Sequence, residues 1–565
     1  MELTGAQILV ECLGREGIDT IFGYPGGAVI DIYDELSRHQ NTLRHILVRH
    51  EQAAVHAADG YSRVSGKVGV CLVTSGPGAT NAVTGIATAY SDSIPMVILT
   101  GQVPTGMIGN DAFQEVDIIG ITRPCTKHSY LIKNIKEMAG IIRQAFYLAR
   151  TGRPGPVLVD LPKDIVISKT DFIWPEEVRM RSYNPTYKPN LVQLRRAADL
   201  ILKARQPLIL AGGGVVASNT ADLLSDLAMR YKIPVVSTLM GLGSFPGTHP
   251  LWCGMVGMHG SVVANRVVNE ADVLVAVGTR FSDRVTGKIS AFASRSSIIH
   301  IDVDPTSIRK NVNVAVPVVS DCRQAIIGLS DVLAARADEK DWEKAHDEWL
   351  SSIVHHKEAH PITYVKNGEI KPQQVIECLY ELTKNKYPVI TTEVGQHQMW
   401  ATQFFKYTKS RTFLSSGGLG TMGYGLPAAM GAQVALPGRL VIGIAGDASI
   451  QMNIQELATI VQNKLPVKIV ILNNRYLGMV RQWQELFYKQ NYMSTCMDGQ
   501  PDFVKLADAY GAEGYLIDDA SKLADMLQTA LDSPNPALID VKVAREENVY
   551  PMVPAGAALD EMLLV

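Results

Sequence analysis

The segment from residue 439 to residue 478 constrains the fold of this chain more than any other part of the sequence. It is predicted to form a strand, a helix and a second strand. The first strand ends with the polar pair Gly446-Asp447, and the second ends with Asn473-Asn474. Strands joined through a helix run parallel, so both polar ends should meet at one edge of an open α/β sheet, where such folds bind their ligands. The segment therefore predicts a doubly wound domain with a polar crevice.

The residues at these strand ends indicate the kind of ligand. Asp447 and Asn474 offer hard oxygen atoms, which Mg²⁺ takes from proteins while phosphate and water complete its octahedron. A helix predicted to start near Asn453 would direct its N-terminus to the same place and favour an anionic group. Alternatively, Asp447 caps that helix and the two asparagines form a turn. The coincidence of both polar pairs around one helix favours a metal-bridged diphosphate site.

The length of the chain indicates several domains. Its 565 residues are too many for one hydrophobic core and suggest three domains. Continuous apolar runs such as residues 68–73 and 467–472 are typical of parallel strands buried on both faces. We therefore predict three tandem doubly wound α/β domains with parallel sheets, the first and third of which could be related. The predicted boundaries are 1–168, 190–333 and 365–550, followed by a C-terminal tail at 551–565.

Charge and cysteine usage narrow the class of protein. The formal net charge is −3 and there are no basic runs, which excludes nucleic acid and anionic membranes as expected partners. Apolar runs are short, so no transmembrane helix is expected. The N-terminus leads directly into an amphipathic helix rather than a signal peptide, and the seven cysteines are scattered singly. These features predict a cytoplasmic α/β protein in a reducing compartment.

Further motifs lie beside predicted strands and give the chain a specific resemblance. Gly446-Asp447-Ala448 followed by Asn473-Asn474 resembles the thiamine-diphosphate signature, in which glycine often stands at the position of Ala448. Alanine is harmless there if that residue has a negative φ. Over essentially its whole length the chain resembles acetohydroxyacid synthase, also called acetolactate synthase. The motifs that carry this resemblance are residues 24–28, 50–52, 75–81, 101–104, 111–115, 152–157, 257–260, 280–284, 417–425 and 478–483.

Glu51 takes on a chemical meaning from this resemblance. It stands between a predicted strand and an alanine-rich helix, where it could be a buried catalytic carboxylate or only a first-turn residue that stabilises the helix dipole. Thiamine diphosphate becomes a nucleophile only if a carboxylic acid hydrogen-bonds N1′ of its pyrimidine. Burial raises the pKa of a glutamate and suits it to share that proton.

The resemblance also assigns roles around the thiamine site. It implies that the first domain binds the pyrimidine and the third binds the diphosphate, so that Glu51 of one subunit faces a cofactor held by another. Mg²⁺ would be bound by Asp447, Asn474 and the backbone carbonyl of Tyr476. Met422 would support the bent form of the cofactor, although methionine is also an ordinary core filler. The other cofactor-binding positions implied are Gly420, Gly446, Ala448, Ser449 and Met479.

A second group of residues resembles the substrate channel of the family. Gln114 and Lys163 resemble catalytic residues that line it, and Phe113 stands at a substrate contact; taken alone, Lys163 would be an ordinary exposed lysine. Arg284 and Trp483 resemble the pair that selects the acceptor, an arginine clamping a 2-oxo acid carboxylate beside an apolar ring. Without the surrounding motifs, Arg284 would form a surface ion pair and Trp483 would anchor an interface.

The middle domain carries a glycine cluster after a predicted strand, which by itself is a weak phosphate signal. In the family this domain binds FAD, which has no net redox role. The intact motif at 280–284 argues against the FAD-free catabolic acetolactate synthases. The positions that resemble FAD contacts are Arg153, Gly212, Gly213, Thr238, Leu239, Met258, His259, Gly278, Arg280, Asp302 and Asp321.

The implied function is a carboligase that depends on thiamine diphosphate, Mg²⁺ and FAD. It would decarboxylate pyruvate and join the two-carbon unit to pyruvate or 2-oxobutanoate, the first common step of branched-chain amino-acid biosynthesis. The implied protein partners are further copies of the chain, in a homodimer or homotetramer with active sites at the interface, and a small regulatory subunit. Pyruvate oxidase and 2-oxo acid decarboxylase are the alternatives. A non-catalytic scaffold is disfavoured because it would have no need of Glu51, Asp447 and Asn474 together.

Overall fold

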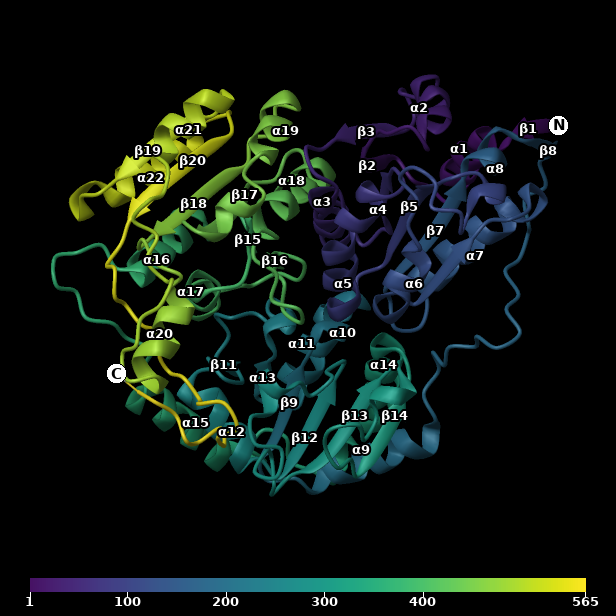
Figure 1. The fold of residues 1–565 in the computed structure, drawn as a ribbon. Coiled ribbons are helices and arrows are strands. Elements are labelled where there is room, and N and C mark those ends of the chain that lie inside the picture. Colours follow the sequence, from purple (N-terminus) through teal and green to yellow (C-terminus); the bar gives the residue numbers. More distant parts are fainter. Residues whose placement is uncertain (565) are drawn as a thin grey trace.

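The computed structural model describes residues 1–564, which contain three six-stranded parallel sheets flanked by helices (Figure 1). The predicted fold class of three tandem doubly wound α/β domains is therefore confirmed. The apolar runs predicted as central strands form buried strands, as the sequence pattern requires when helices cover both faces. No helix in this part of the chain is long and apolar enough to span a bilayer.

The first domain carries the N-terminus. Its strands are β2 Thr20–Tyr24, β3 Arg44–Leu47, β4 Gly69–Val73, β5 Met96–Gln102, β6 His128–Leu131 and β7 Pro156–Pro162. Its helices are α1 Gly5–Arg15, α2 Ile30–Ser37, α3 Glu51–Ser65, α4 Pro77–Asn81, α5 Val83–Asp92, α6 Ile118–Thr122, α7 Met138–Arg150 and α8 Lys163–Ile167. The sheet order is β3-β2-β4-β5-β7-β6. A short antiparallel pair, β1 (Glu2–Thr4) with β8 (Lys169–Asp171), ties the N-terminus to the end of this domain.

The middle domain has a different topology. Its strands are β9 Pro207–Ala211, β10 Val235–Ser237, β11 Trp252–Met255, β12 Val273–Val277, β13 Ser297–Asp302 and β14 Val316–Val319. Its helices are α9 Leu191–Lys203, α10 Gly213–Ala217, α11 Ala221–Arg230, α12 Val262–Glu270, α13 Asp283–Thr286 and α14 Cys322–Ala334, and α15 Asp347–Ala359 follows. The order β11-β10-β9-β12-β13-β14 reverses direction between β9 and β12, where doubly wound sheets open a crevice.

The third domain repeats the strand order of the first. Its strands are β15 Val389–Thr392, β16 Phe413–Leu414, β17 Val441–Gly446, β18 Lys468–Asn473, β19 Glu513–Ile517 and β20 Ala537–Lys542. Its helices are α16 Pro372–Thr383, α17 Gln396–Phe404, α18 Gly425–Ala435, α19 Glu456–Gln462, α20 Gly478–Phe487, α21 Phe503–Tyr510 and α22 Leu523–Asp532. The order β16-β15-β17-β18-β20-β19 matches that of the first sheet strand for strand, as expected if the two domains are related.

The first and third domains pack against each other through α3 and α18, which lie side by side (Figure 1). Glycines make this close approach possible. A Cβ atom on Gly60 would collide with the carbonyl of Ala428, and one on Gly431 with the carbonyl of Ala57. One hydrophobic core continues across the contact. Because α3 begins with Glu51, this packing also fixes the position of that residue.

The C-terminal segment lies on the middle domain rather than projecting away from the molecule (Figure 1). The amide of Val553 donates to the carbonyl of Met258 at 2.8 Å, and the amide of Lys288 donates to the carbonyl of Ala557 at 2.9 Å. The segment predicted as a tail is therefore packed against the domain that carries the FAD candidates.

Candidate active site

The candidate thiamine site lies where three neighbouring strands of the third sheet end. The strands β15, β17 and β18 are adjacent and parallel. Past their carboxyl ends lie His397, Asp447 and Asn474 respectively. The sheet order reverses between β15 and β17, so this edge is the expected ligand crevice of the fold.

Asp447 is the most unusual residue at this edge. It is 1% exposed, and within residues 1–564 neither carboxylate oxygen has a hydrogen-bond partner. Burial raises the pKa of Asp447 to about 7. A buried carboxylate without partners is unfavourable, and a divalent cation would both pair its oxygens and keep it ionised. This arrangement fits the metal that the sequence predicts.

Asn474 lies in the same place but is partly engaged. Its side-chain oxygen accepts from the amide of Tyr476 at 3.1 Å, and its nitrogen donates to Gln396 Oε1 at 3.4 Å. Asn473, by contrast, donates to Asp540 Oδ1 at 2.8 Å, which is a structural role. In the described part of the chain no three His, Cys, Asp or Glu side chains group as a metal site. The predicted ligand set contains a single residue of these types, so the metal roles of Asn474 and Tyr476 stay predictions.

His397, which lies beside Gly446, was not predicted from the sequence. The imidazole is buried, and burial lowers the pKa of His397 to about 3, so the ring is neutral. Its Nε2 has no partner among the described residues, and a Cβ atom built on Gly446 would lie 3.3 Å from its Nδ1. A signal existed, because His397 also follows a buried strand and a glycine. Glu393 directly follows that strand, but it is not part of a polar pair such as those at residues 446–447 and 473–474.

The segment after Asp447 differs from the prediction. A 3₁₀ turn covers Ser449–Met452, and α19 begins only at Glu456, not near Asn453. The side chain of Asn453 instead donates to the carbonyl of Gly423 at 2.8 Å, which competes with helix formation. The predicted helix N-terminus at the diphosphate is therefore wrong.

The backbone around the Gly-Asp element supports the other expectation for this segment. Ala448 has a φ of −81°, so its methyl group is accommodated without strain, as predicted. Ser449 Oγ lies 3.2 Å from the amide of Gly446 and closes the turn. Of the other thiamine candidates, Met422 and Met479 are half-buried, and Gly420 has a φ of 74°, which favours glycine.

Glu51 is the first residue of α3 and is half-buried in the single chain, not enclosed. Its Oε2 accepts a hydrogen bond from Asn81 Nδ2 at 3.0 Å. A Cβ atom on Gly78 would lie 3.3 Å from Oε1, so this glycine leaves space beside the carboxylate. Glu51 therefore lies in the first turn of the helix, where it can stabilise the helix dipole. It also faces the motif at residues 75–81, as expected of a residue that contacts thiamine diphosphate.

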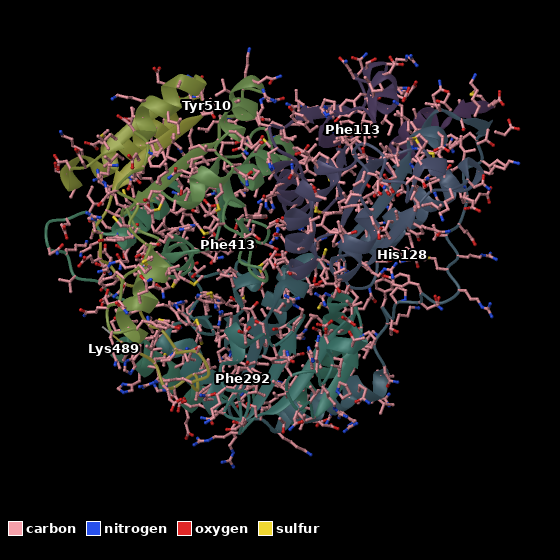
Figure 2. All side chains as sticks on the ribbon, viewed as in Figure 1. Phe113, His128, Phe292, Phe413, Lys489 and Tyr510 are labelled. Carbon is pink, nitrogen blue, oxygen red and sulfur yellow. The ribbon has the colours of Figure 1, made fainter. Side chains whose placement is uncertain are left out.

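Two of the predicted channel residues, Phe113 and Gln114, lie in a loop of the first domain, and the third, Lys163, begins α8. Lys163 is not an ordinary exposed lysine, because its Nζ donates to the carbonyl of Gly27 at 3.1 Å. Gln114 has a φ of 59°. Its backbone packs tightly on Gly76, because a Cβ atom built on Gly76 would lie only 2.7 Å from the carbonyl oxygen of Gln114. Phe113 is 88% exposed at the surface (Figure 2).

Arg284 and Trp483 lie on separate elements, α13 and α20. The Arg284 side chain is exposed, 3.3 Å from Asp283 Oδ2. The Trp483 ring packs edge-on against Phe487, with 5.4 Å between ring centroids. Within residues 1–564 no hydrogen bond or ion pair joins the predicted pair, so its joint role in acceptor selection stays a prediction.

Some of the FAD candidates lie at or beside the switch point of the middle sheet. Gly212 and Gly278 follow the adjacent strands β9 and β12, and a Cβ atom on Gly212 would collide with the carbonyl of Gly278. Gly278 has a φ of 60°, a conformation that favours glycine. Asp302 ends β13, where burial raises its pKa to about 6, and burial lowers the pKa of Arg280. Glycine at these two positions allows the segments after β9 and β12 to approach each other closely.

Two of the other FAD candidates, Asp321 and Arg153, already bond to other residues of the chain. Asp321 caps α14 through bonds from two backbone amides. Arg153 donates to Ser93 Oγ at 2.8 Å and lies 3.7 Å from Asp304. Burial lowers the pKa of His259 to about 4, and its Nδ1 has no partner in the described residues. The remaining candidates follow β9, β10 and β11: Gly213, Thr238, Leu239 and Met258.

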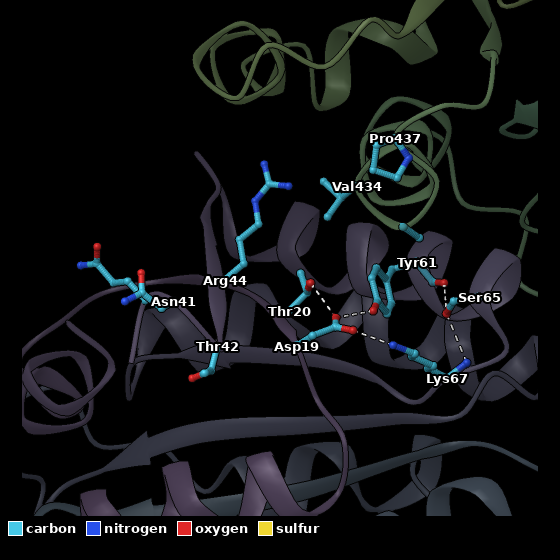
Figure 3. A pocket seen from close by; sticks show the side chains of 12 residues that line it. Asp19, Thr20, Asn41, Thr42, Arg44, Tyr61, Ser65, Lys67, Val434 and Pro437 are labelled. Carbon is cyan, nitrogen blue, oxygen red and sulfur yellow. Dashed lines mark hydrogen bonds and ion pairs between the residues drawn. The ribbon is translucent and has the colours of Figure 1, made fainter. Parts of the chain in front are cut away.

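An open cavity of about 420 Å³ lies between the first and third domains and shares no residue with the sites above (Figure 3). Asp19 on its wall accepts from Tyr61 at 2.6 Å, from Thr20 at 2.9 Å and from Lys67 at 2.5 Å. Because these polar groups satisfy one another, the cavity does not carry a candidate site.

Comparison with known proteins decides the family. Models of thiamine pyrophosphate enzymes match residues 3–121 (N-terminal TPP binding domain), 194–329 (central domain) and 393–541 (C-terminal TPP binding domain). The acetolactate synthase isozyme 3 large subunit of Escherichia coli strain K12 is 48% identical, covering 100% of this chain and 98% of that protein. The acetolactate synthase large subunit of Haemophilus influenzae is 46% identical over the same shares. The chain belongs to the acetolactate synthase large-subunit family.

Membership in the acetolactate synthase family confirms several predictions at once. The chain is a thiamine-diphosphate enzyme with acetolactate synthase function, in preference to the oxidase and decarboxylase alternatives. The central family model spans the middle sheet from β9 to β14. The N-terminal model ends at residue 121, before β6 and β7 complete the first sheet, so the domain boundaries stay predictions.

Proposed function

We propose that this enzyme binds thiamine diphosphate through Mg²⁺ held by Asp447, Asn474 and the carbonyl of Tyr476. The single observation that carries the proposal is the buried Asp447 carboxylate, which lacks hydrogen-bond partners within residues 1–564. When bound, the cofactor supplies the nucleophilic carbon and accepts the electrons released as CO₂ leaves. His397, neutral and beside Gly446, would donate a hydrogen bond to the diphosphate.

The proposed role of Glu51 is to hold a proton at N1′ of the pyrimidine. The half-buried carboxylate leaves one side open, with Asn81 on Oε2 and the space above Gly78 at Oε1. A second copy of the chain would cover that side and exclude water from the carboxylate. The active form in this proposal is therefore a homodimer, or a homotetramer built from two such dimers.

FAD is the second proposed cofactor, bound at the middle sheet. The close approach of Gly212 and Gly278 and the half-buried cationic side chain of Arg280 suit the pyrophosphate of a dinucleotide. Arg153 would reach the same ligand from the first domain. Asp321 would contribute mainly as a helix cap, because its carboxylate is already occupied.

The proposed substrates are pyruvate, as donor, and pyruvate or 2-oxobutanoate, as acceptor. Arg284 has an exposed guanidinium able to bind a carboxylate bidentately, and Trp483 offers an apolar face to the ethyl group of 2-oxobutanoate. Gln114, Lys163 and Phe113 would line the path to the cofactor. Lys163 donates a hydrogen bond to the carbonyl of Gly27, and the backbone of Gln114 packs on Gly76.

A small regulatory subunit is a further proposed partner. It is supported by the relatives named above, which are described as large subunits. Assays with the large subunit alone and with a candidate small subunit would then give different turnover, and equal turnover would count against such a partner.

The function is tested by incubating purified protein with pyruvate, thiamine diphosphate, Mg²⁺ and FAD and separating the products. Acetolactate is expected. Acetaldehyde as the main product would indicate a decarboxylase, and acetyl phosphate formed in the presence of phosphate and oxygen would indicate an oxidase. Omitting Mg²⁺ or FAD in parallel tests the two cofactors individually, and an unchanged rate after complete removal of either would overturn that cofactor's role.

A further inference from the structure

The segment at residues 415–424, which carries Gly420 and Met422, is held by side chains of another domain. Four residues of the first domain reach it from α3 and α5 across the domain contact. We call these four residues the clamp: Asp59, Arg63, Thr88 and Asp92.

Arg63 and Asp59 hold the two ends of the segment. Arg63 Nη1 donates to the carbonyl of Ser415 at 2.9 Å, at the start of the segment. At its end, the hydroxyl of Tyr424 donates to Asp59 Oδ1 at 2.6 Å. Asp59 and Arg63 are themselves joined, with 2.6 Å between Asp59 Oδ1 and Arg63 Nε. The two ends are therefore fixed relative to each other by one ion pair.

Asp92 holds the backbone between these ends. Its Oδ1 accepts from the amide of Gly418 at 2.7 Å and its Oδ2 from the amide of Gly417 at 3.1 Å. The same Oδ2 accepts from Arg63 Nη2 at 2.9 Å, so Arg63 connects both carboxylates of the clamp. Both oxygens of Asp92 are thus used, and two of their three partners belong to the segment.

Thr88 completes the set, with 2.7 Å between its hydroxyl oxygen and that of Thr421. The clamp therefore touches the segment on both sides of Gly420 and Met422. Its charged side chains are almost completely enclosed: the Asp59 and Asp92 side chains are 0% exposed and that of Arg63 is 6% exposed. Charges buried in this way keep one geometry, because moving apart would leave them without partners.

We propose that the clamp residues are positioning residues that set residues 415–424 in the cofactor-binding conformation before the cofactor arrives. Naming the cofactor as thiamine diphosphate rests on the proposed function. Preorganisation of this kind favours binding because the loop loses little conformational freedom when the ligand enters. The alternative is that the clamp only joins the two domains and does not affect the cofactor site.

Two substitutions separate these alternatives. Asp92→Asn replaces one carboxylate oxygen with an NH₂ group, which donates and cannot accept from a glycine amide. Thr88→Val removes only the hydroxyl that meets Thr421 and keeps the side-chain shape. Thr100→Val is the matched control, because Thr100 is a fully buried threonine of the same domain whose hydroxyl donates to Asp160 at 2.7 Å, away from the segment.

The first measurement is thiamine diphosphate affinity at saturating Mg²⁺, followed by intrinsic fluorescence, together with kcat at saturating cofactor. We expect the Kd to rise about tenfold or more in Asp92→Asn and less in Thr88→Val, while kcat recovers at saturating cofactor; tenfold corresponds to about 1.4 kcal/mol. Thr100→Val should leave the Kd unchanged even if it lowers the melting temperature. A Kd unchanged in both clamp variants, or raised equally in the control, would overturn the proposal.

The second measurement is amide hydrogen exchange of the cofactor-free protein. We expect faster exchange within residues 415–424 in both clamp variants and not in the control, because Asp92 accepts from the amides of Gly417 and Gly418 and Thr88 holds the side chain of the neighbouring Thr421. This measurement does not require the cofactor. If wild-type protein failed to bind thiamine diphosphate, the proposed function would fall, while exchange would still decide whether the clamp holds the segment. Should Asp92→Asn not fold, Thr88→Val decides both measurements.

Discussion

The first and third domains have the same strand order but place different chemistry at the same edge. In the third domain, Asp447 is 1% exposed and both of its oxygens lack partners in the described residues. In the first domain, Glu51 is half-buried and one oxygen is already bonded to Asn81. A shared topology therefore fixes where functional side chains lie, and the residues after each strand fix what they can do.

The two carboxylates also differ in what their surroundings lack in the single chain. Asp447 is buried within one chain and, in the proposed function, needs only a cation to pair its oxygens. The environment of Glu51 is open on one side and, in the proposed function, is completed by a second chain. Substitution of Asp447 should therefore weaken cofactor binding, and substitution of Glu51 should reduce turnover.

The largest expected effect comes from Asp447→Ala. Removing the carboxylate should weaken Mg²⁺ and thiamine diphosphate binding together by at least about 100-fold, because loss of even an outer partner of a metal ligand costs about 10–100-fold. Titration of the cofactor at several fixed Mg²⁺ concentrations, followed by fluorescence, measures both. An unchanged affinity would show that Asp447 has only a structural role and that it does not differ from Glu51 in the way proposed.

Glu51→Gln should leave binding nearly intact and reduce turnover. The amide cannot exchange a proton with N1′, and loss of a positioned acid or base costs about 10²–10⁴-fold in rate. The variant should bind thiamine diphosphate with an affinity close to that of wild type, and kcat at saturating cofactor gives the effect on rate. Near wild-type kcat would contradict the assignment, and a large loss of affinity would show that the two domains do not divide the work as proposed.

The smallest effect is expected on product choice. Trp483→Leu removes an aromatic face on α20, and one methylene in an apolar pocket changes specificity by about 10–200-fold at most. In a competition between pyruvate and 2-oxobutanoate at fixed ratio, the share of the product from 2-oxobutanoate should fall while pyruvate decarboxylation stays nearly constant. Trp483→Phe serves as the control that keeps a ring. If the product ratio does not change, Trp483 is a packing residue and selection lies at Arg284 or elsewhere.

Strand ends were predictable from the sequence because apolar runs show where a buried parallel strand stops. That pattern located Asp447 and Asn474 correctly, and it predicted the three sheets. His397 also follows a buried strand, but it was missed because it lies five residues past the end of that strand and outside any polar pair. The helix start near Asn453 was also predicted wrongly, since the hydrogen bond of Asn453 to Gly423 depends on a segment distant in sequence.

The clamp could not be predicted from the sequence. Each of its residues, taken alone, is an ordinary polar position on an amphipathic helix. The contact from Tyr424 to Asp59 joins residues 365 positions apart, and Thr88 and Thr421 are 333 positions apart. Such pairs depend on how the first domain docks on the third, and no local periodicity encodes that docking.

The glycine contact between α3 and α18 has a consequence for how the chain is made. Gly60 and Gly431 allow the two helices to touch, and one core runs through both domains. On a ribosome that adds about 5–20 residues per second, the partner of α3 emerges about 20–70 s after α3 itself. During that interval the small-residue face of the nascent first domain is exposed, so co-translational folding of this protein should depend on chaperones that shield this face until the last third of the chain is complete.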